Sequence, residues 1–172
     1  IAGYMIMNDL SARQMQMEEM KLNLGPAKGK DFGTIVGPYM VTPDELAQYE
    51  TKAHDGHVGR NHSLEMKCWV NDKLESEGNA DTMTYTFAEI IERASYGVDL
   101  MPGDIIGSGT VGTGCYLELN GTRKREDDNY EPVWLKPGDE VVMEITGLGR
   151  LENKVVQEEG DVYSILDKKK NV

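Results

Sequence analysis

Apolar and polar residues alternate over much of this chain, which predicts β-strands. Between His62 and Val70 the even-numbered positions are apolar and most of the odd-numbered ones are polar, as in a half-exposed strand. Asn71-Asp72 predicts a tight turn into a second strand over 73–77, so the pair forms a hairpin. The apolar runs 1–7 and 34–42 predict further strands, the first of them buried.

Three stretches carry helix-start signals instead. Ser11-Ala-Arg-Gln14 fits the capping-box pattern and predicts a helix that continues to about Leu22. Thr42-Pro43 predicts a short helix with Thr42 as N-cap. Thr86 begins the third helix, which ends at Gly97 and whose apolar face is formed by Phe87, Ile90, Ile91 and Ala94. Strands outnumber these short helices, so we predict an α+β fold that is mainly β and antiparallel, not a doubly wound sheet.

Two short sequences repeat the same turn. Leu100-Met-Pro-Gly-Asp104 and Leu135-Lys-Pro-Gly-Asp139 both place Pro before Gly, the order that suits the central positions of a type II turn. Gly takes the positive φ angle there, and we expect each turn to lead into a strand.

The glycine-rich stretch 107–114, GSGTVGTG, begins with the spacing G-x-G-x-x-G. A dinucleotide site needs these glycines to open a helix within a βαβ unit. The residues 115–121 alternate and predict a strand, which argues against a nucleotide site. Two interpretations remain open: a tight structural loop between strands, or a loop whose backbone passes close to a ligand.

The charge balance limits the partners of the chain. Its 172 residues include 30 acidic and 18 basic side chains, for a net charge of −12. This charge disfavours nucleic acid and anionic membrane surfaces as partners, but a pocket for a small anionic substrate can still be locally basic. No apolar run approaches the ~20 residues of a membrane span. With no visible signal peptide and two distant cysteines, we expect a reduced, cytoplasmic protein.

Candidate chemistry begins where the first strand ends. On one continuous helix Asp9, Arg13 and Gln16 would form one narrow stripe. Two interpretations stay open: a solvated ion pair at i,i+4, or binding groups on a rigid scaffold. The histidines of HDGHVGRNH (His54, His57 and His62) fall largely in a predicted polar loop, 51–61, whose glycines argue against a metal site.

Four motifs together resemble the fumarylacetoacetate hydrolase family: MNDLSARQMQ, LGPAKGKDFGT, LMPGDIIGSGT and LELNG. The similarity covers the chain from Ile1 to about Val156. We therefore predict a catalytic domain over 1–157 of the C-terminal type found in that family, followed by a polar tail, 158–172. The resemblance implies a mixed β-sandwich roll with a few short helices. It also implies a divalent metal (Mg²⁺, Ca²⁺ or Mn²⁺), a small keto-acid substrate, a homodimer, and a role in keto acid catabolism or the degradation of aromatic compounds.

The resemblance also implies roles for individual residues. Asp9 matches a metal-binding aspartate, and Lys30 a catalytic lysine that lies near both metal and substrate. Glu118 matches a catalytic glutamate that partners a histidine in activating water. The remaining substrate-contacting positions are Arg13, Gln16 and Thr110. With these roles, the glycines of 107–114 would let the backbone approach the substrate carboxylate.

Two features of the family are missing from this chain. The family normally has a Glu-x-Glu pair upstream of the N-D-x-S-A-R element, and its catalytic histidine lies further upstream. Only eight residues precede Asp9, so we expect an N-terminal segment or a second chain to complete the site. Alone, the chain is expected to bind metal weakly and not to catalyse. The leading function is hydrolysis of a carbon–carbon bond in a β-diketo acid of the acylpyruvate or fumarylacetoacetate type. The alternatives are an isomerase, decarboxylase or dehydratase of a related 2-keto acid, or a non-catalytic subunit or binding module.

Overall fold

The computed structural model describes residues 1–23, 25–157 and 159, and within them it is mainly β with a few short helices. Its strands form three antiparallel sheets. One sheet pairs β1 (Tyr4–Asp9) with β2 (Thr34–Val41), and a second pairs β3 (Glu50–Lys52) with β4 (Arg60–His62). The third has the order β6-β5-β7-β8, formed by β5 (Glu65–Val70), β6 (Lys73–Asn79), β7 (Glu140–Ile145) and β8 (Gly149–Lys154). The mainly β fold class is thus confirmed.

The hydrophobic core lies where the β1–β2 ribbon meets the four-stranded sheet. β1 contacts β7 and β8, and β2 contacts β8. Ile6 in the middle of β1 is fully buried, but the rest of β1 is partly buried or exposed and Ile1 and Ala2 lie exposed before it, so the predicted buried strand 1–7 is confirmed only in part. The residues buried with it are Val41, Leu46, Leu64, Ile145, Leu148 and Leu151.

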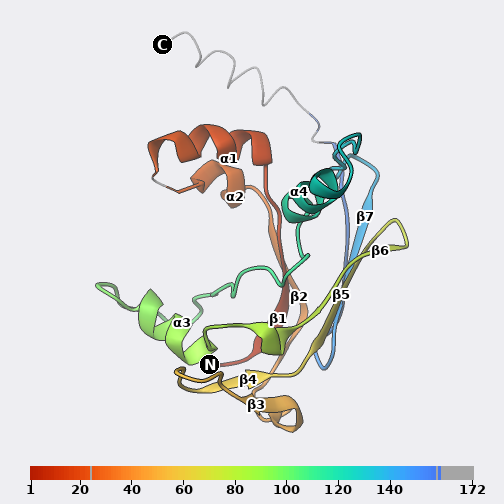
Figure 1. Cartoon of the computed structure of the whole chain (residues 1–172). Coiled ribbons are helices and arrows are strands. Elements are labelled where there is room, and N and C mark those ends of the chain that lie inside the picture. Colours follow the sequence, from red (N-terminus) through yellow and green to blue (C-terminus); the bar gives the residue numbers. More distant parts are fainter. Residues whose placement is uncertain (24, 158, 160–172) are drawn as a thin grey trace.

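The helices are short and lie at two ends of the molecule. The α-helices are α1 (Arg13–Glu19), α2 (Ala27–Asp31), α3 (Phe87–Ala94) and α4 (Tyr116–Glu126), and the 3₁₀ turns are Met20–Leu22, Ala47–Tyr49 and Ala80–Thr82. Figure 1 shows α1, α2 and α4 at one end, with α3, β3 and β4 at the other. None of the described helices is both long and apolar enough to cross a membrane.

Several local predictions are confirmed. Thr86 caps α3 in a complete capping box with Glu89. The hairpin of β5 and β6 turns at Asn71-Asp72, where both residues have positive φ. In the two Pro-Gly turns Gly103 and Gly138 have φ of 102° and 100°. Only the second of these turns leads into a strand.

Other local predictions are wrong at their ends. Ser11 does not cap the first helix, which begins later, after Ala12, without any side-chain cap. The chain from Leu10 to Ala12 is instead held by backbone bonds to Gly33 and Gly29. No α-helix follows Thr42, only a turn and then the 3₁₀ turn Ala47–Tyr49. The predicted loop 51–61 contains parts of β3 and β4, because these short polar segments pair with each other.

The largest error concerns 115–121, predicted as a strand but observed as the start of α4. This helix contains Leu, Glu, Arg and Lys, which all favour helices. Glu118 lies in its first turn and Arg123, Lys124 and Arg125 in its last, so the side-chain charges complement the helix dipole. The prediction of a strand was based on the alternation of residue types over 115–121, which is too short to outweigh these helix signals.

Candidate active site at the end of the first strand

Asp9, the last residue of β1, forms an ion pair with Lys30 of α2, with 2.7 Å between Oδ2 and Nζ. The side chains are 46% and 32% exposed, respectively, so the pair is open to solvent. Asp9 lies opposite Thr34, the first residue of β2, and the next residue, Leu10, donates its N–H to Gly33. The strand pairing thereby fixes the backbone of Asp9 beside the start of the helical end.

Arg13 and Gln16 lie on α1, which packs closely on α2. The Arg13 Nη1 donates to the Gln16 Oε1 at 2.7 Å. A Cβ at Gly29 of α2 would lie 2.9 Å from the Cβ of Gln16, so glycine allows this close approach. Glu19 joins the two helices further, since its carboxylate accepts the N–H groups of residues 28 and 29. Arg13, Gln16 and Lys30 therefore belong to one helical pair. The predicted helical stripe with Asp9 is wrong, because Asp9 is in a strand.

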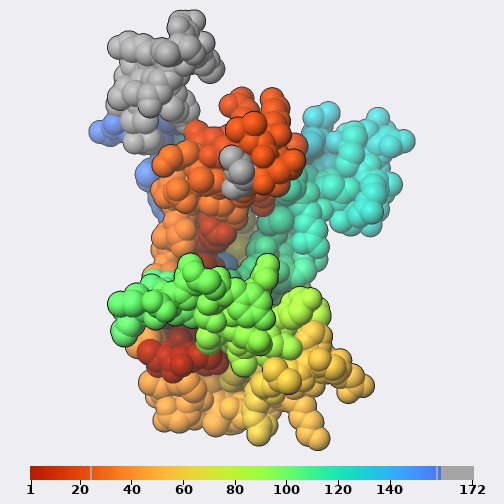
Figure 2. Space-filling view, turned by 90° about the vertical axis from the view of Figure 1, so that its left-hand side faces the viewer, coloured from red at the N-terminus to blue at the C-terminus, as the bar shows by residue number. Residues whose placement is uncertain are grey.

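Thr110 lies in the glycine-rich stretch 107–114, which passes between β1 and β6. A Cβ at Gly107 would lie 2.9 Å from the sulfur of Met7, and one at Gly78 would lie 2.6 Å from a methyl of Val111. The stretch 108–112 lines a cavity of about 440 Å³, together with residues of β1, β5 and α3. Figure 2 shows the surface hollowed between the orange helical end and the green α3 segment, with red N-terminal residues at its floor.

Glu118 lies in the first turn of α4 and faces back to the glycine-rich stretch. Its Oε2 accepts the backbone N–H of Thr113 at 2.9 Å. A carboxylate at this position also interacts favourably with the positive end of the helix dipole. The alternation in the sequence suggested a strand, so this contact was not foreseen.

The predicted residues thus form three groups: Asp9 with Lys30, Arg13 with Gln16, and Thr110 and Glu118 in and after the glycine-rich stretch. No hydrogen bond or ion pair links Glu118 to the Asp9–Lys30 pair among the described residues. Figure 1 places α4, which carries Glu118, at the same end of the molecule as α1 and α2. A ligand that contacts the two pairs and Glu118 would therefore lie across this end, whereas Thr110 lines the cavity that it shares with α3.

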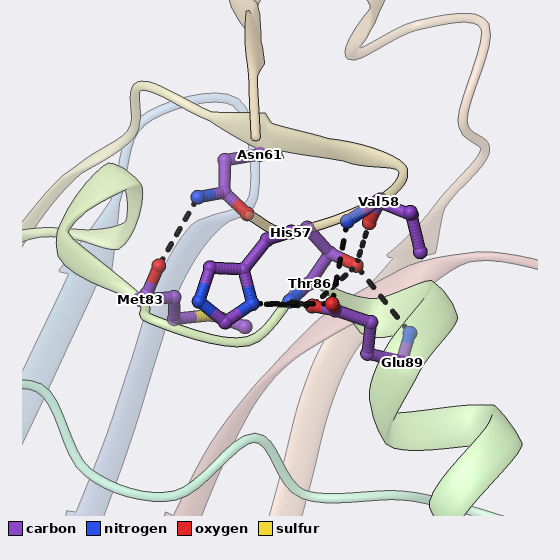
Figure 3. A network of polar contacts seen from close by, with 6 residues as sticks. All are labelled: His57, Val58, Asn61, Met83, Thr86 and Glu89. Atoms are coloured by element: carbon purple, nitrogen blue, oxygen red, sulfur yellow. Dashed lines mark hydrogen bonds and ion pairs between the residues drawn. The ribbon is translucent and has the colours of Figure 1, made fainter. Parts of the chain in front are cut away.

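The three histidines do not gather around one point. His54 contacts the backbone oxygen of Asp81, and the ring of His62 packs edge-on against Tyr4. His57 binds the carboxylate of Glu89 at 3.1 and 3.2 Å (Figure 3). In the part of the chain that the structure describes, no group of three or more His, Cys, Asp or Glu residues could hold a metal ion.

A helix does follow the glycine-rich stretch, contrary to the prediction. The sheets described are antiparallel, however, so the stretch is not part of a parallel βαβ unit. The N–H of Thr113 just before α4 is already bonded to Glu118 and is not free for a phosphate. The geometry of this loop therefore does not support a nucleotide site.

Sequence reasoning missed an ion pair beneath α4. The Arg123 Nη2 lies 2.7 Å from the Glu75 Oε2, and the Glu75 side chain is only 8% exposed. Burial opposes ionisation of Glu75, but hydrogen bonds from Arg123 and Lys73 outweigh it and lower its pKa. Burial and the nearby Glu75 charge raise the pKa of Tyr116 to about 12. No spacing rule could have found this pair, because 48 residues separate its partners.

Fold and sequence together define the class of protein. Residues 1–156 match the family model described as fumarylacetoacetate (FAA) hydrolase C-terminal, so the chain belongs to this family. It is 36% identical over 159 residues to the mitochondrial oxaloacetate tautomerase Fahd2a of Rattus norvegicus, covering 91% of this chain and 42% of that protein. It is 32% identical over 170 residues to the fumarylacetoacetase of Oryza sativa subsp. japonica, and this match covers 83% of this chain and 39% of that protein. The chain thus spans less than half the length of these relatives.

Solved structures agree with the fold. The fumarylacetoacetate hydrolase of Exiguobacterium antarcticum aligns with a TM-score of 0.62 and 28% identity, over 91% of this chain and 47% of that one. The fumarylpyruvate hydrolase of Pseudomonas aeruginosa, solved with Mn²⁺ and pyruvate, aligns with a TM-score of 0.64 and 21% identity. The alignment covers 91% of this chain and 55% of that one. At this identity the second match supports the fold alone.

Proposed function

We propose that this chain contributes part of the active site of a divalent-metal-dependent enzyme that hydrolyses a carbon–carbon bond in a small β-diketo acid. The observation that carries the proposal is the solvent-open pair of Asp9 and Lys30. It offers an anionic oxygen for a cation and an ammonium group for a developing negative charge at one place. Family membership supports the same chemistry.

The donor set suits a hard cation that keeps water and substrate oxygens in its shell. Mg²⁺ is commonly bound through one or two carboxylates together with water and substrate oxygens. Asp9 would supply one carboxylate, and further ligands would come from another segment or from a second copy in a homodimer. When bound, the cation polarises the keto oxygen as a Lewis acid.

The other residues have distinct proposed roles. Arg13 and Gln16 bind the keto-acid end of the substrate, for which the planar guanidinium suits the carboxylate. Thr110 contacts the same carboxylate from the glycine-rich stretch. Lys30 stabilises the enolate formed as the bond breaks. Glu118 orients a histidine that deprotonates water. Water adds to the distal carbonyl carbon, and the bond to the methylene breaks. A carboxylic acid leaves, and the remaining 2-keto acid enolate takes up a proton.

A second candidate, tautomerisation of a 2-keto acid, shares the enolate but does not need water to attack. Identity of 36% over 159 residues to a rat oxaloacetate tautomerase favours it. The two reactions differ in their products: hydrolysis of acetylpyruvate yields pyruvate and acetate, whereas tautomerisation changes only the enol absorbance.

The test combines metal binding with product analysis. Both measurements use the assembly in which the N-terminal segment or second chain completes the site. Mn²⁺ binding in the presence of oxalate is followed by electron paramagnetic resonance, and acetylpyruvate and oxaloacetate are assayed with Mg²⁺. We expect Asp9→Ala to abolish both the bound Mn²⁺ signal and metal-dependent turnover. Bound Mn²⁺ that survives in this variant would refute the site. Loss of enol absorbance without pyruvate formation would replace hydrolysis by tautomerisation.

A further inference from the structure

A β-bulge in β6 lies beneath α4. Cys68 of β5 pairs with Ser76, and the next residue, Trp69, pairs with Leu74, so Glu75 is an extra residue without a partner on β5. Neighbouring residues of a regular strand point to opposite faces, but a bulge re-aims one of them. Glu75 and Ser76 accordingly both bond to the segment 113–123.

Ser76 in the bulge is connected to Glu118 through Thr113, which bonds to both residues. The buried Ser76 Oγ lies 3.0 Å from the Thr113 Oγ1, and the Thr113 N–H donates to the Glu118 Oε2 at 2.9 Å. Thr113 has a φ of 70°, a left-handed conformation that is unfavourable for a β-branched residue. The surrounding contacts must hold it there. This conformation directs the N–H toward the carboxylate.

Glu75 fixes the same helix at a second point. Its carboxylate lies 2.7 Å from Arg123, more than one turn after Glu118. Asn120 is the buried residue of α4, and it bonds to the backbone of Val133 and to the Tyr130 hydroxyl. These polar contacts fix the rotation of the helix as well as its position.

We propose that Glu75, Ser76 and Thr113 are positioning residues that hold the Glu118 carboxylate in one orientation. Thr113 occupies Oε2, which leaves Oε1 for the histidine that the proposed function assigns to Glu118. The importance of this orientation for catalysis rests on the proposed function. The orientation itself is a property of the described residues and can be measured without turnover.

The deciding measurement is the amide ¹H shift of position 113 in the ¹⁵N-labelled full chain, followed over the acidic pH range. In the unmodified chain this shift should follow ionisation of Glu118 and stop responding in Glu118→Gln. Ser76→Ala and Thr113→Val should reduce the amplitude of the response, because one lost hydrogen bond lowers the ratio of held to released carboxylate about five-fold. Thr113→Ser keeps the hydroxyl and should retain the response.

Ser95→Ala is the matched control, because that hydroxyl bonds the backbone of Glu92 beside α3 at the other end of the molecule. It should leave the response intact. A full response in a folded Ser76→Ala or Thr113→Val chain would overturn the proposal, as would a flat response in the unmodified chain. If the response behaves as expected but the assembly with a completed site turns over no keto acid, the positioning stands and the proposed function fails.

Discussion

Two carboxylates, at opposite ends of the molecule, have very different surroundings. The Glu89 side chain is 18% exposed. Its carboxylate accepts hydrogen bonds from the backbone N–H groups of Thr86 and Val58 and also contacts a ring nitrogen of His57 (Figure 3). Asp9 is 46% exposed, and its one hydrogen-bonding side-chain partner among the described residues is Lys30. Glu89 uses its lone pairs on the protein itself, whereas among the described side chains Asp9 uses one oxygen for Lys30 and leaves the other open to solvent.

This difference separates a structural carboxylate from a candidate functional one. A carboxylate that accepts several backbone N–H groups holds loops and helix starts together. One that has a single mobile partner on the surface adds little to stability. Replacing Asp9 or its partner should therefore affect ligand chemistry, and breaking the Glu89 network should affect folding.

Lys30→Met should show the largest effect. Loss of the ammonium group should reduce turnover about a hundred-fold, the typical range for removing one electrostatic contact to developing charge. Binding of Mn²⁺ should not weaken, because the cation no longer shares the Asp9 oxygen with Lys30. Steady-state kinetics and Mn²⁺ titration measure the two effects separately.

Lys28→Met provides the control for that prediction. Lys28 is exposed on the same helix, and only its backbone N–H takes part in the bond to Glu19. Replacing Lys28 should change neither turnover nor Mn²⁺ binding. Weaker Mn²⁺ binding in Lys30→Met would mean that Lys30 supports the metal site and does not compete with the cation.

The sequence predicted elements whose signals are local. The cap at Thr86, the turn at Asn71-Asp72 and the positive φ of Gly103 and Gly138 each depend on a few adjacent residues. The start of α1 failed because backbone bonds to Gly29 and Gly33, which no local rule includes, replace the expected cap at Ser11. For α4, the short alternation over 115–121 favours a strand, but the helix-favouring residues and the charges at the two ends of the segment favour the observed helix.

The candidate site divides in the same way. Arg13 and Gln16 are three residues apart and their contact followed from helical spacing. Asp9 and Lys30 meet because β1 pairs with β2 and α1 packs on α2, and only the family resemblance indicated both residues. The contact of Glu118 with Thr113 spans only five residues, but it depends on the start of α4, where a strand was predicted. The bulge at Glu75 depends on pairing between strands, which residue spacing does not reveal.

Thr86→Val should have the largest effect on stability in the Glu89 region. Thr86 is fully buried, and its hydroxyl both caps α3 and donates to the backbone oxygen of Val58. Loss of a cap of this kind should lower the free energy of unfolding by about 1–2 kcal/mol, measured by urea denaturation. Thr82→Val removes an exposed hydroxyl nearby and should change the free energy of unfolding by less than about 0.5 kcal/mol. Equal effects would show that the Glu89 network is not a structural centre.

The smallest effect concerns the pH dependence of the same network. The N–H of Thr86 is the main cause of a lowered pKa for Glu89; Val58 and His57 add to it against the effect of burial. A lowered folded-state pKa adds stability above the ordinary pKa of 4.5, and this contribution is lost as the pH falls through the lowered value. The difference in unfolding free energy between the unmodified chain and Glu89→Gln should therefore be largest above pH 4.5 and shrink in acid. Glu152→Gln removes an exposed partner of Arg150. Its difference in unfolding free energy from the unmodified chain should be small and should not change with pH. If the difference for Glu89→Gln also does not change with pH, the Glu89 carboxylate of α3 is no more engaged in folding than an ordinary surface carboxylate.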